Sequence, residues 1–318
     1  MKIVLAAIVA LLPFAAFAAP ICPTHPVPAG LARIQDVMGA GRFIAYVPTA
    51  LRVIDGKTSP VTEADLEADL KVLRPRFDGL ITYSAHSGNE RVADVAARLG
   101  FRAVIMGIYD IGNKTERANV AAAAKRTPIV SGVSVGNEVV YGQRGTFQDL
   151  ARAMEELRKA APGLAIATTE PFHLLVTPAA APALLQSDIV LANVHPVFEP
   201  WFRAAPDFNG AEFVVNVAGD VAKTYCGPVL VKETGVPTAP TDKGFTPARQ
   251  ASFYKELQKQ FIPSRTRAFA FFSAFDAPWR VNDAHPVPGY HPEEAYWGLY
   301  DEKRNAKPVV ATIPELKR

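Results

Sequence analysis

The sequence predicts a single α/β domain folded as a (β/α)8 barrel, or TIM barrel. Eight short runs rich in β-branched residues alternate with helical patterns along the chain, which is the spacing of βαβ units. The competing fold is a doubly wound open sheet, which normally carries a glycine-rich phosphate turn after its first strand. Here that place holds Tyr-Val-Pro-Thr-Ala at 46–50, so the closed barrel is favoured.

The predicted strands begin after residue 41. They cover 43–47, 79–83, 102–108, 129–136, 164–168, 188–194, 228–232 and 267–272. The fourth run is uncharged and made of small and β-branched residues, which is typical of a strand buried on both faces. Eight such units in 318 residues are sufficient for one closed barrel.

Amphipathic helices are predicted between these strands. They cover 62–73, 89–99, 115–125, 146–160 and 246–261. In the first, Leu66, Leu70 and Leu73 form one apolar stripe and Thr62 is the expected N-cap. We find no internal repeat or linker, so residues 42–318 are predicted to form one catalytic domain.

The chain before residue 42 divides into two parts. Residues 1–19 are predicted to be a signal peptide, with Lys2, an apolar stretch and the small-x-small site Ala-Phe-Ala at 16–18. Pro13 interrupts the apolar stretch, which is short for a membrane anchor. Residues 20–41 are rich in Pro and Gly and are expected to form a surface arm. The mature protein is therefore expected to be exported, to the periplasm or the extracellular space.

Composition excludes several classes of function. The chain has 34 Lys and Arg against 31 Asp and Glu, and this small excess predicts neither nucleic-acid nor membrane binding. After export, Cys22 and Cys226 could form one disulfide, although two free thiols remain the alternative. The six histidines lack metal-ligand spacing, so no metal or other cofactor is expected. We expect a monomer.

Two glutamates follow buried strands. Glu138 comes after the fourth predicted strand and Glu233 after the seventh. A carboxylate is costly to desolvate, so its presence at such a position usually reflects a function. The carboxyl ends of all strands of a barrel meet at one mouth, where active sites lie. The two carboxylates are therefore predicted to work as a pair, whereas a third, Glu170, is expected only to orient a neighbour.

Aromatic side chains are also predicted at this mouth. Aromatic faces with scattered hydrogen-bonding groups suit sugar rings, whereas a phosphate site would need cations or glycine amides. Two carboxylates facing across a sugar indicate glycoside hydrolysis, with one of them kept protonated by apolar surroundings or by its negative neighbour. The candidate sugar contacts outside the pair are Tyr46, Tyr83, Tyr109, His195, Phe198, Phe275, Trp279 and Trp297.

These segments resemble glycoside hydrolase family 17, the β-1,3-glucanases and glucanosyltransferases of the clan of retaining barrel glycosidases. The resemblance rests on Val-Gly-Asn-Glu at 135–138, Glu-Thr-Gly-Val-Pro-Thr at 233–238, Phe-Ser-Ala-Phe-Asp at 272–276 and Glu-Ala-Tyr-Trp-Gly-Leu-Tyr at 294–300. It implies a β-glucan oligosaccharide or polysaccharide as substrate. Double displacement would proceed through a covalent glycosyl-enzyme, with hydrolysis or glucanosyl transfer as the outcome.

The resemblance also implies individual roles. Glu138 would be the acid/base and Glu233 the nucleophile, Asn137 would bind the sugar 2-hydroxyl, and Glu294 would match a later carboxylate of the plant members. Ala277, Arg280 and the His-Pro-Val-Phe segment at 195–198 depart from the plant pattern, so the glucan subsites are expected to differ.

Two other classes of function remain open. Gly-Val-Ser-Val-Gly at 132–136 fits the nucleophile elbow of serine hydrolases, although Ser134 lies within a predicted strand rather than at a turn into a helix. A barrel that binds carbohydrate without cleaving it is the other alternative.

Overall fold

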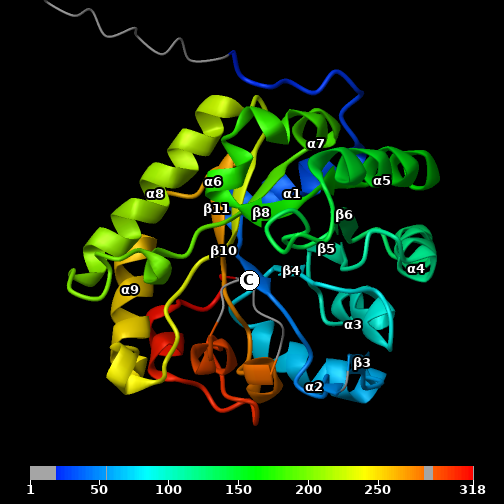
Figure 1. Cartoon of the computed structure of the whole chain (residues 1–318). Helices are drawn as coiled ribbons and strands as arrows, with labels where there is room; N and C mark the ends of the chain where they lie inside the picture. The colour runs from blue at the N-terminus through cyan, green and yellow to red at the C-terminus, as the bar shows by residue number, and fades with distance from the viewer. Residues whose placement is uncertain (1–18, 55, 283–288, 318) are drawn as a thin grey trace, which may run out of the picture.

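The computed structural model describes residues 19–54, 56–282 and 289–317. Its core is a barrel of parallel strands, which confirms the predicted fold (Figure 1). The barrel strands are β1 (Phe43–Ala45), β4 (Gly79–Ile81), β5 (Ala103–Ile108), β6 (Val130–Val135), β7 (Ala165–Ala167), β8 (Thr169–Pro171), β9 (Val190–Asn193), β10 (Val229–Glu233) and β11 (Arg267–Phe271). Only Thr168 separates β7 from β8, so these two short strands together count as one of the eight strands of the barrel. Strand β11 pairs with β1 and closes the barrel.

The outer ring of the barrel is helical (Figure 1). It contains α2 (Glu63–Leu73), α3 (Val92–Arg98), α4 (Lys114–Arg126), α5 (Phe147–Ala160), α6 (Phe172–Leu175), α7 (Ala181–Gln186), α8 (Asp207–Thr224) and α9 (Pro247–Gln260). The five predicted helices all appear. Thr62 and Thr146 cap α2 and α5 through capping boxes, in which each hydroxyl accepts from the backbone N–H three residues later.

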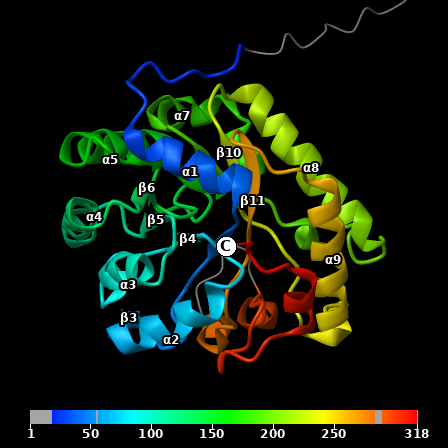
Figure 2. The same cartoon turned by 180° about the vertical axis from the view of Figure 1, so that it is seen from behind.

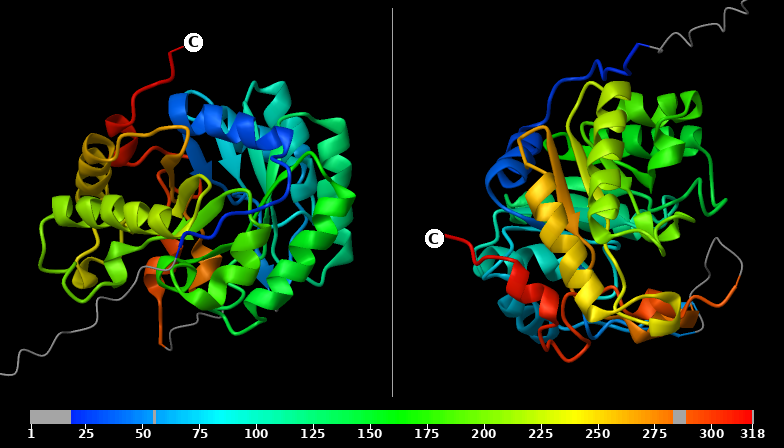
Figure 3. Two further views of the ribbon diagram at one scale, coloured as in Figure 1. Left: turned by 90° about the horizontal axis from the view of Figure 1, so that it is seen from above. Right: turned by 90° about the vertical axis from the view of Figure 1, so that its left-hand side faces the viewer.

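Short turns of 3-10 helix lie between these elements and after β11. These turns are η1 (Asn89–Arg91), η2 (Pro178–Ala180), η3 (Pro196–Phe198), η4 (Thr241–Lys243), η5 (Pro278–Asn282), η6 (Pro292–Ala295) and η7 (Pro308–Thr312). A two-stranded hairpin pairs β2 (Val53–Ile54) with β3 (Lys57–Thr58). The C-terminal segment lies beside α9 (Figure 3), where Gln258 donates to the carbonyl of Thr312 at 3.2 Å. Further on, the N–H of Leu316 donates to the carbonyl of Pro75 at 2.9 Å, so this segment spans from α9 to the end of α2.

Helix α1 (Ala29–Ala40) closes the N-terminal end of the barrel (Figure 2). The sequence predicted a surface arm over residues 20–41, and the structure differs because Leu31, Ile34, Val37 and Met38 form one apolar helical face. This face packs on the side chains that fill the barrel interior, in one cluster of buried residues. A Cβ at Gly30 would lie 2.0 Å from the carbonyl oxygen of Ser131, so the close approach of helix and barrel requires glycine there.

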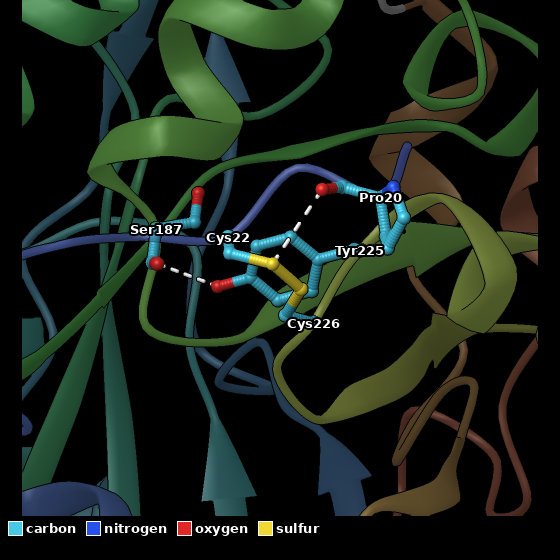
Figure 4. The surroundings of a disulfide bond; sticks show 5 residues. All are labelled: Pro20, Cys22, Ser187, Tyr225 and Cys226. Carbon is cyan, nitrogen blue, oxygen red and sulfur yellow. Dashed lines mark hydrogen bonds between the residues drawn. A yellow bond between two sulfur atoms is a disulfide. The ribbon is translucent and has the colours of Figure 1, made fainter. Parts of the chain in front are cut away.

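A disulfide between Cys22 and Cys226 fastens the chain before α1 to the body (Figure 4). The N–H of Ile21 donates to the carbonyl of Thr224 at 2.9 Å, and the N–H of Cys226 donates to the carbonyl of Ile21 at 3.1 Å. Between them, the Tyr225 hydroxyl donates to the carbonyl of Ser187 at 2.5 Å (Figure 4). Ile21 and Cys22 are therefore held against the end of α8.

Removal of this disulfide is expected to destabilise the protein. The bond joins residues 204 positions apart, and a long closed loop restricts the unfolded chain strongly. The double variant C22S/C226S should lose about 2–5 kcal/mol of unfolding free energy, measured by urea denaturation without reductant. A reduced wild-type sample should match the variant, and an unchanged midpoint in both would contradict the prediction.

The predicted signal peptide, residues 1–19, lies almost entirely outside the described residues. Among the residues that are described, no helix is long and apolar enough to cross a membrane.

Candidate active site

Glu138 is presented by a sharp turn after β6. Gly136 has a φ of 77° and Glu138 a φ of 51°, both in the left-handed region. The N–H of Glu138 donates to the carbonyl of Thr169 at 2.8 Å, which ties the turn to the neighbouring strand β8. A left-handed conformation is unfavourable for a residue with a side chain and is concentrated at functional sites.

The carboxyl group of Glu138 lies in an environment that favours its protonated form. Burial raises the pKa of Glu138, and the negative charge of Glu233 raises it further. Asn193, at the end of β9, donates from Nδ2 to Glu138 Oε1 at 2.8 Å. A protonated carboxylic acid held by a fixed hydrogen bond has the properties of a general acid.

Glu233 ends β10 and is surrounded by donors. Lys232 donates from Nζ to Oε1 at 2.8 Å, and the Tyr83 hydroxyl donates to the same oxygen at 2.9 Å. His195 Nε2 lies 3.5 Å from Oε2. Burial alone would raise the pKa of Glu233, but the ammonium of Lys232 and the hydrogen bond and charge of His195 outweigh it, so the net shift is downward.

The two glutamates therefore have pKa shifts in opposite directions. Environments that separate the pKa values of two neighbouring carboxyl groups identify which of them is the acid and which the base. In this site Glu138 is suited to donate a proton while Glu233 stays ionised. The sequence predicted the pair, and the structure supplies the physical difference between its members.

One wall of the site is aromatic. The ring of His195 contacts Phe198, Phe272 and Trp297, with centroids 5.6, 5.3 and 5.1 Å away. Phe198, in η3, is 51% exposed, whereas Trp297 is buried. Of the predicted sugar contacts, Tyr83, His195, Phe198 and Trp297 thus lie together with Glu233.

The other predicted sugar contacts lie in different surroundings. Tyr46 is buried and its hydroxyl donates to Asp69 Oδ2 at 2.9 Å, and its ring makes a T-shaped contact with the ring of Phe275. These two side chains belong to the hydrophobic core. Tyr109 is 47% exposed, with the Arg144 guanidinium 4.6 Å from its ring centroid.

Glu294 and Trp279 lie in the segment that follows β11. Glu294 in η6 is buried and pairs with Arg280 of η5, Nη2 to Oε2, at 2.8 Å. Trp279, also in η5, is partly buried against the core. The guanidinium of Arg280 lies 6.0 Å from the ring of Phe272, which connects this segment to the aromatic wall.

Three residues near the pair were not among the predicted site residues. Asn193 lies within a predicted strand, and the sequence alone does not separate it from the other residues of the sheet. Phe272 ends the last predicted strand in the same way. Lys232 directly precedes Glu233, and neighbouring residues of a regular strand point to opposite faces. One feature of the sequence could have identified Asn193 and Lys232 as site residues. Each is a polar residue at or near the carboxyl end of a predicted barrel strand.

Glu170 supports the turn that carries Glu138. Its carboxylate is fully buried and accepts from the N–H groups of Val140 and Tyr141, at 2.8 and 3.1 Å. Burial raises its pKa to about 7 despite these hydrogen bonds, and the charge of Glu138 also raises it. This geometry fits the expectation that Glu170 orients a neighbour.

The pH dependence of stability is expected to report this buried carboxyl. The pKa of Glu170 in the folded protein, about 7, is above its ordinary value of 4.5, so its contribution to stability is complete below pH 4.5 and is lost as pH rises through 7. That loss amounts to about 3 kcal/mol. The variant E170Q does not titrate at this position and should lack this loss. In urea unfolding from pH 4.5 to 7.5, the unfolding free energy of the wild type should therefore fall by about 3 kcal/mol relative to that of E170Q. Parallel curves would exclude this shift.

Ser134 does not occupy a nucleophile elbow. It lies inside β6, is buried, and its hydroxyl is within 3.2 Å of the Gly136 carbonyl oxygen and 3.0 Å of the Thr169 hydroxyl. An elbow requires a sharp strand-to-helix turn with an exposed hydroxyl. The serine esterase alternative is therefore not favoured.

A (β/α)8 barrel with glutamates of opposite pKa shift at the ends of its fourth and seventh strands defines a barrel glycoside hydrolase. Residues 44–298 match the BtgE/BtgC glycoside hydrolase domain family, and the chain belongs to this family. The predicted resemblance to family 17 is thereby confirmed.

Two curated relatives span most of the chain. A glucan 1,3-beta-glucosidase of Arthroderma benhamiae is 28% identical over 262 residues, covering 77% of this chain and 83% of the relative. The glucan 1,3-beta-glucosidase BGL2 of Candida albicans is 22% identical over 265 residues, covering 76% and 84%.

Solved structures share the fold. The glycoside hydrolase family 17 beta-1,3-glucanosyltransferase of Rhizomucor miehei superposes with a TM-score of 0.65 at 19% identity, covering 86% of this chain and 98% of that one. A plant beta-glucan endohydrolase does so with a TM-score of 0.55 at 17% identity, covering 83% and 98%.

Proposed function

We propose that this protein cleaves β-1,3-glucan with retention of configuration and transfers part of the product to sugar acceptors. The observation that carries the proposal is the pair of glutamates with opposite pKa shifts. The substrate class is supported by relatives named glucan 1,3-beta-glucosidase and by the fold shared with a beta-1,3-glucanosyltransferase.

In the first step, Glu233 attacks the anomeric carbon and the glycosidic bond breaks. The electron pair of that bond leaves with the departing sugar oxygen, which takes the proton of Glu138. The product is a glycosyl ester on Glu233 and an ionised Glu138. Asn193, bonded to Glu138 Oε1, fixes the orientation of the acid.

In the second step, an acceptor hydroxyl attacks the anomeric carbon from the opposite face. Ionised Glu138 takes the acceptor's proton, the ester bond breaks, and its electron pair returns to Glu233. Water as the acceptor gives hydrolysis, and a sugar hydroxyl gives transfer. The exposed ring of Phe198 beside the site offers a stacking surface for a glucan unit.

The mature chain is proposed to act outside the cytoplasm, as a monomer. A disulfide that persists requires an oxidising compartment, and Cys22–Cys226 fastens the segment that directly follows the predicted signal peptide.

Incubation with defined laminari-oligosaccharides tests the proposal. Mass spectrometry should detect shortened products together with products longer than the donor, and proton NMR should show the β-anomer first. Cello-oligosaccharides of equal length are the matched control and should stay uncut. Absence of cleavage, or an α-anomer as the first product, would overturn the proposal.

A further inference from the structure

Lys232 is a buried cation in the site that the two-step mechanism above does not use. It is only 1% exposed and directly precedes Glu233. The pairing of β10 with β9 shifts register between Val231 and Glu233, so the strand is irregular at Lys232. Such an irregularity redirects a side chain and is common near active sites. As a result, two consecutive side chains meet, with Nζ 2.8 Å from Glu233 Oε1.

The groups that the structure places close to the Lys232 ammonium all favour a positive charge. Nζ donates to Asn137 Oδ1 at 2.5 Å and to Glu233 Oε1 at 2.8 Å. It also lies 4.2 Å from the ring centroid of Tyr83, over its negative face. Lys232 therefore bridges the turn after β6 and the end of β10, the two segments that supply the glutamates.

The donors around Glu233 are distributed unequally between its two oxygens. Oε1 receives Lys232 and Tyr83 at 2.8 and 2.9 Å, whereas Oε2 faces His195 at the longer distance of 3.5 Å. The lone pairs of Oε2 are thus the more available. Oε2 is the oxygen expected to attack, and Oε1 becomes the carbonyl oxygen of the ester.

We infer that Lys232 accelerates the breakdown of the glycosyl-enzyme, because its ammonium at Oε1 stabilises the Glu233 carboxylate that the second step releases. The inference rests on the proposed function and goes beyond it by assigning a role to a third charged group. When the ester forms, Oε1 loses negative charge beside the ammonium. When the ester C–O bond breaks, the electron pair returns to the carboxylate and this charge is restored. The ammonium therefore opposes the first step and favours the second.

The same contact orients Asn137. Its Oδ1 accepts from Lys232, so its amide nitrogen is the end left to donate to a sugar hydroxyl. A glutamine or methionine at position 232 would remove the charged donor that fixes this orientation.

The test compares K232M, the uncharged donor variant K232Q and the conservative variant K232R on an activated aryl β-laminaribioside. In K232M and K232Q, release of the aryl alcohol should show a pre-steady-state burst, and the ratio of the second-step to the first-step rate constant should fall by about tenfold or more. K232R should restore much of this ratio because it keeps the charge. Intact-mass spectrometry should find the accumulated glycosyl-enzyme.

The matched control is R158M, which breaks the 3.0 Å ion pair between Arg158 of α5 and Asp188, a buried residue that precedes β9. This variant should lose stability without changing the ratio of rate constants. If K232M does not fold, K232Q carries the test. A ratio equal to that of the wild type in a folded K232Q would overturn the inference.

A second readout needs no activity. Titration of 13C-labelled glutamate carboxyls by NMR, with Glu233 assigned through E233Q, should show a higher pKa for Glu233 in K232Q than in the wild type. An unchanged pKa would overturn the inference even if glucan cleavage is observed. A raised pKa in an enzyme that does not cleave glucan would instead refute only the proposed substrate and reaction.

Discussion

Replacement of Glu233 by glutamine is expected to lower the turnover of laminari-oligosaccharides by about 10⁴-fold or more, since a covalent nucleophile cannot be bypassed easily. The glutamine is close in shape to the glutamate and keeps an acceptor for Lys232 and Tyr83, so the fold should be retained. Initial rates, with circular dichroism as the check on folding, measure the effect.

The stereochemistry of chemical rescue tests the role of Glu233 more sharply. The smaller variant E233A, supplied with azide and an activated aryl glycoside, should form an α-glycosyl azide, because azide enters from the face that the carboxylate has vacated. A β-glycosyl azide from this variant would show that Glu233 is the acid/base instead.

Replacement of Glu138 by glutamine should produce a loss that depends on the leaving group. Without a general acid, cleavage of natural oligosaccharides should fall by about 10²–10⁴-fold. An activated aryl glycoside, which needs no proton on its leaving oxygen, should lose much less in the first step. Measuring kcat/KM on both substrates separates these cases, and equal losses on both would contradict the assignment.

The pH profile of E138Q supplies the control for this assignment. In the wild type, kcat/KM should decrease as pH rises through the raised pKa of Glu138, because the acid must be protonated. In E138Q, kcat/KM should no longer decrease at high pH. The decrease of kcat/KM at low pH should remain, because it is caused by protonation of Glu233. The matched variant E138A with azide should form a β-glycosyl azide, the opposite of the product expected from E233A.

The barrel and its glutamate pair could be predicted because both depend on local patterns. Each strand is a short apolar run, and the two glutamates follow such runs at positions that a parallel barrel brings together. Helix α8 could not be predicted in this way. It contains Gly210 and Gly219, which are weak helix formers, and Pro206 gives it no side-chain cap. Burial of Val214, Val217 and Val221 stabilises it, and that is a tertiary effect.

The role inferred for Lys232 could not be predicted from the sequence for a different reason. In a regular strand, the side chains of residues 232 and 233 would point to opposite faces. The register shift against β9 makes β10 irregular here, and the Lys232 ammonium donates to the Glu233 carboxylate. Such an irregularity depends on the pairing partner. Asn193 was likewise ambiguous, because its role depends on the turn that places Glu138 2.8 Å away.

The position of α1 has a consequence for the order of folding. This helix is the first described helix along the chain, yet it packs on strands that include β11, whose last residue is Phe271. Contacts between segments so far apart in sequence form late, because the intervening chain must be ordered first. During synthesis, the apolar face of α1 can therefore be covered completely only after β11 has been made. The helix that covers this end of the barrel is therefore made before every strand on which it packs.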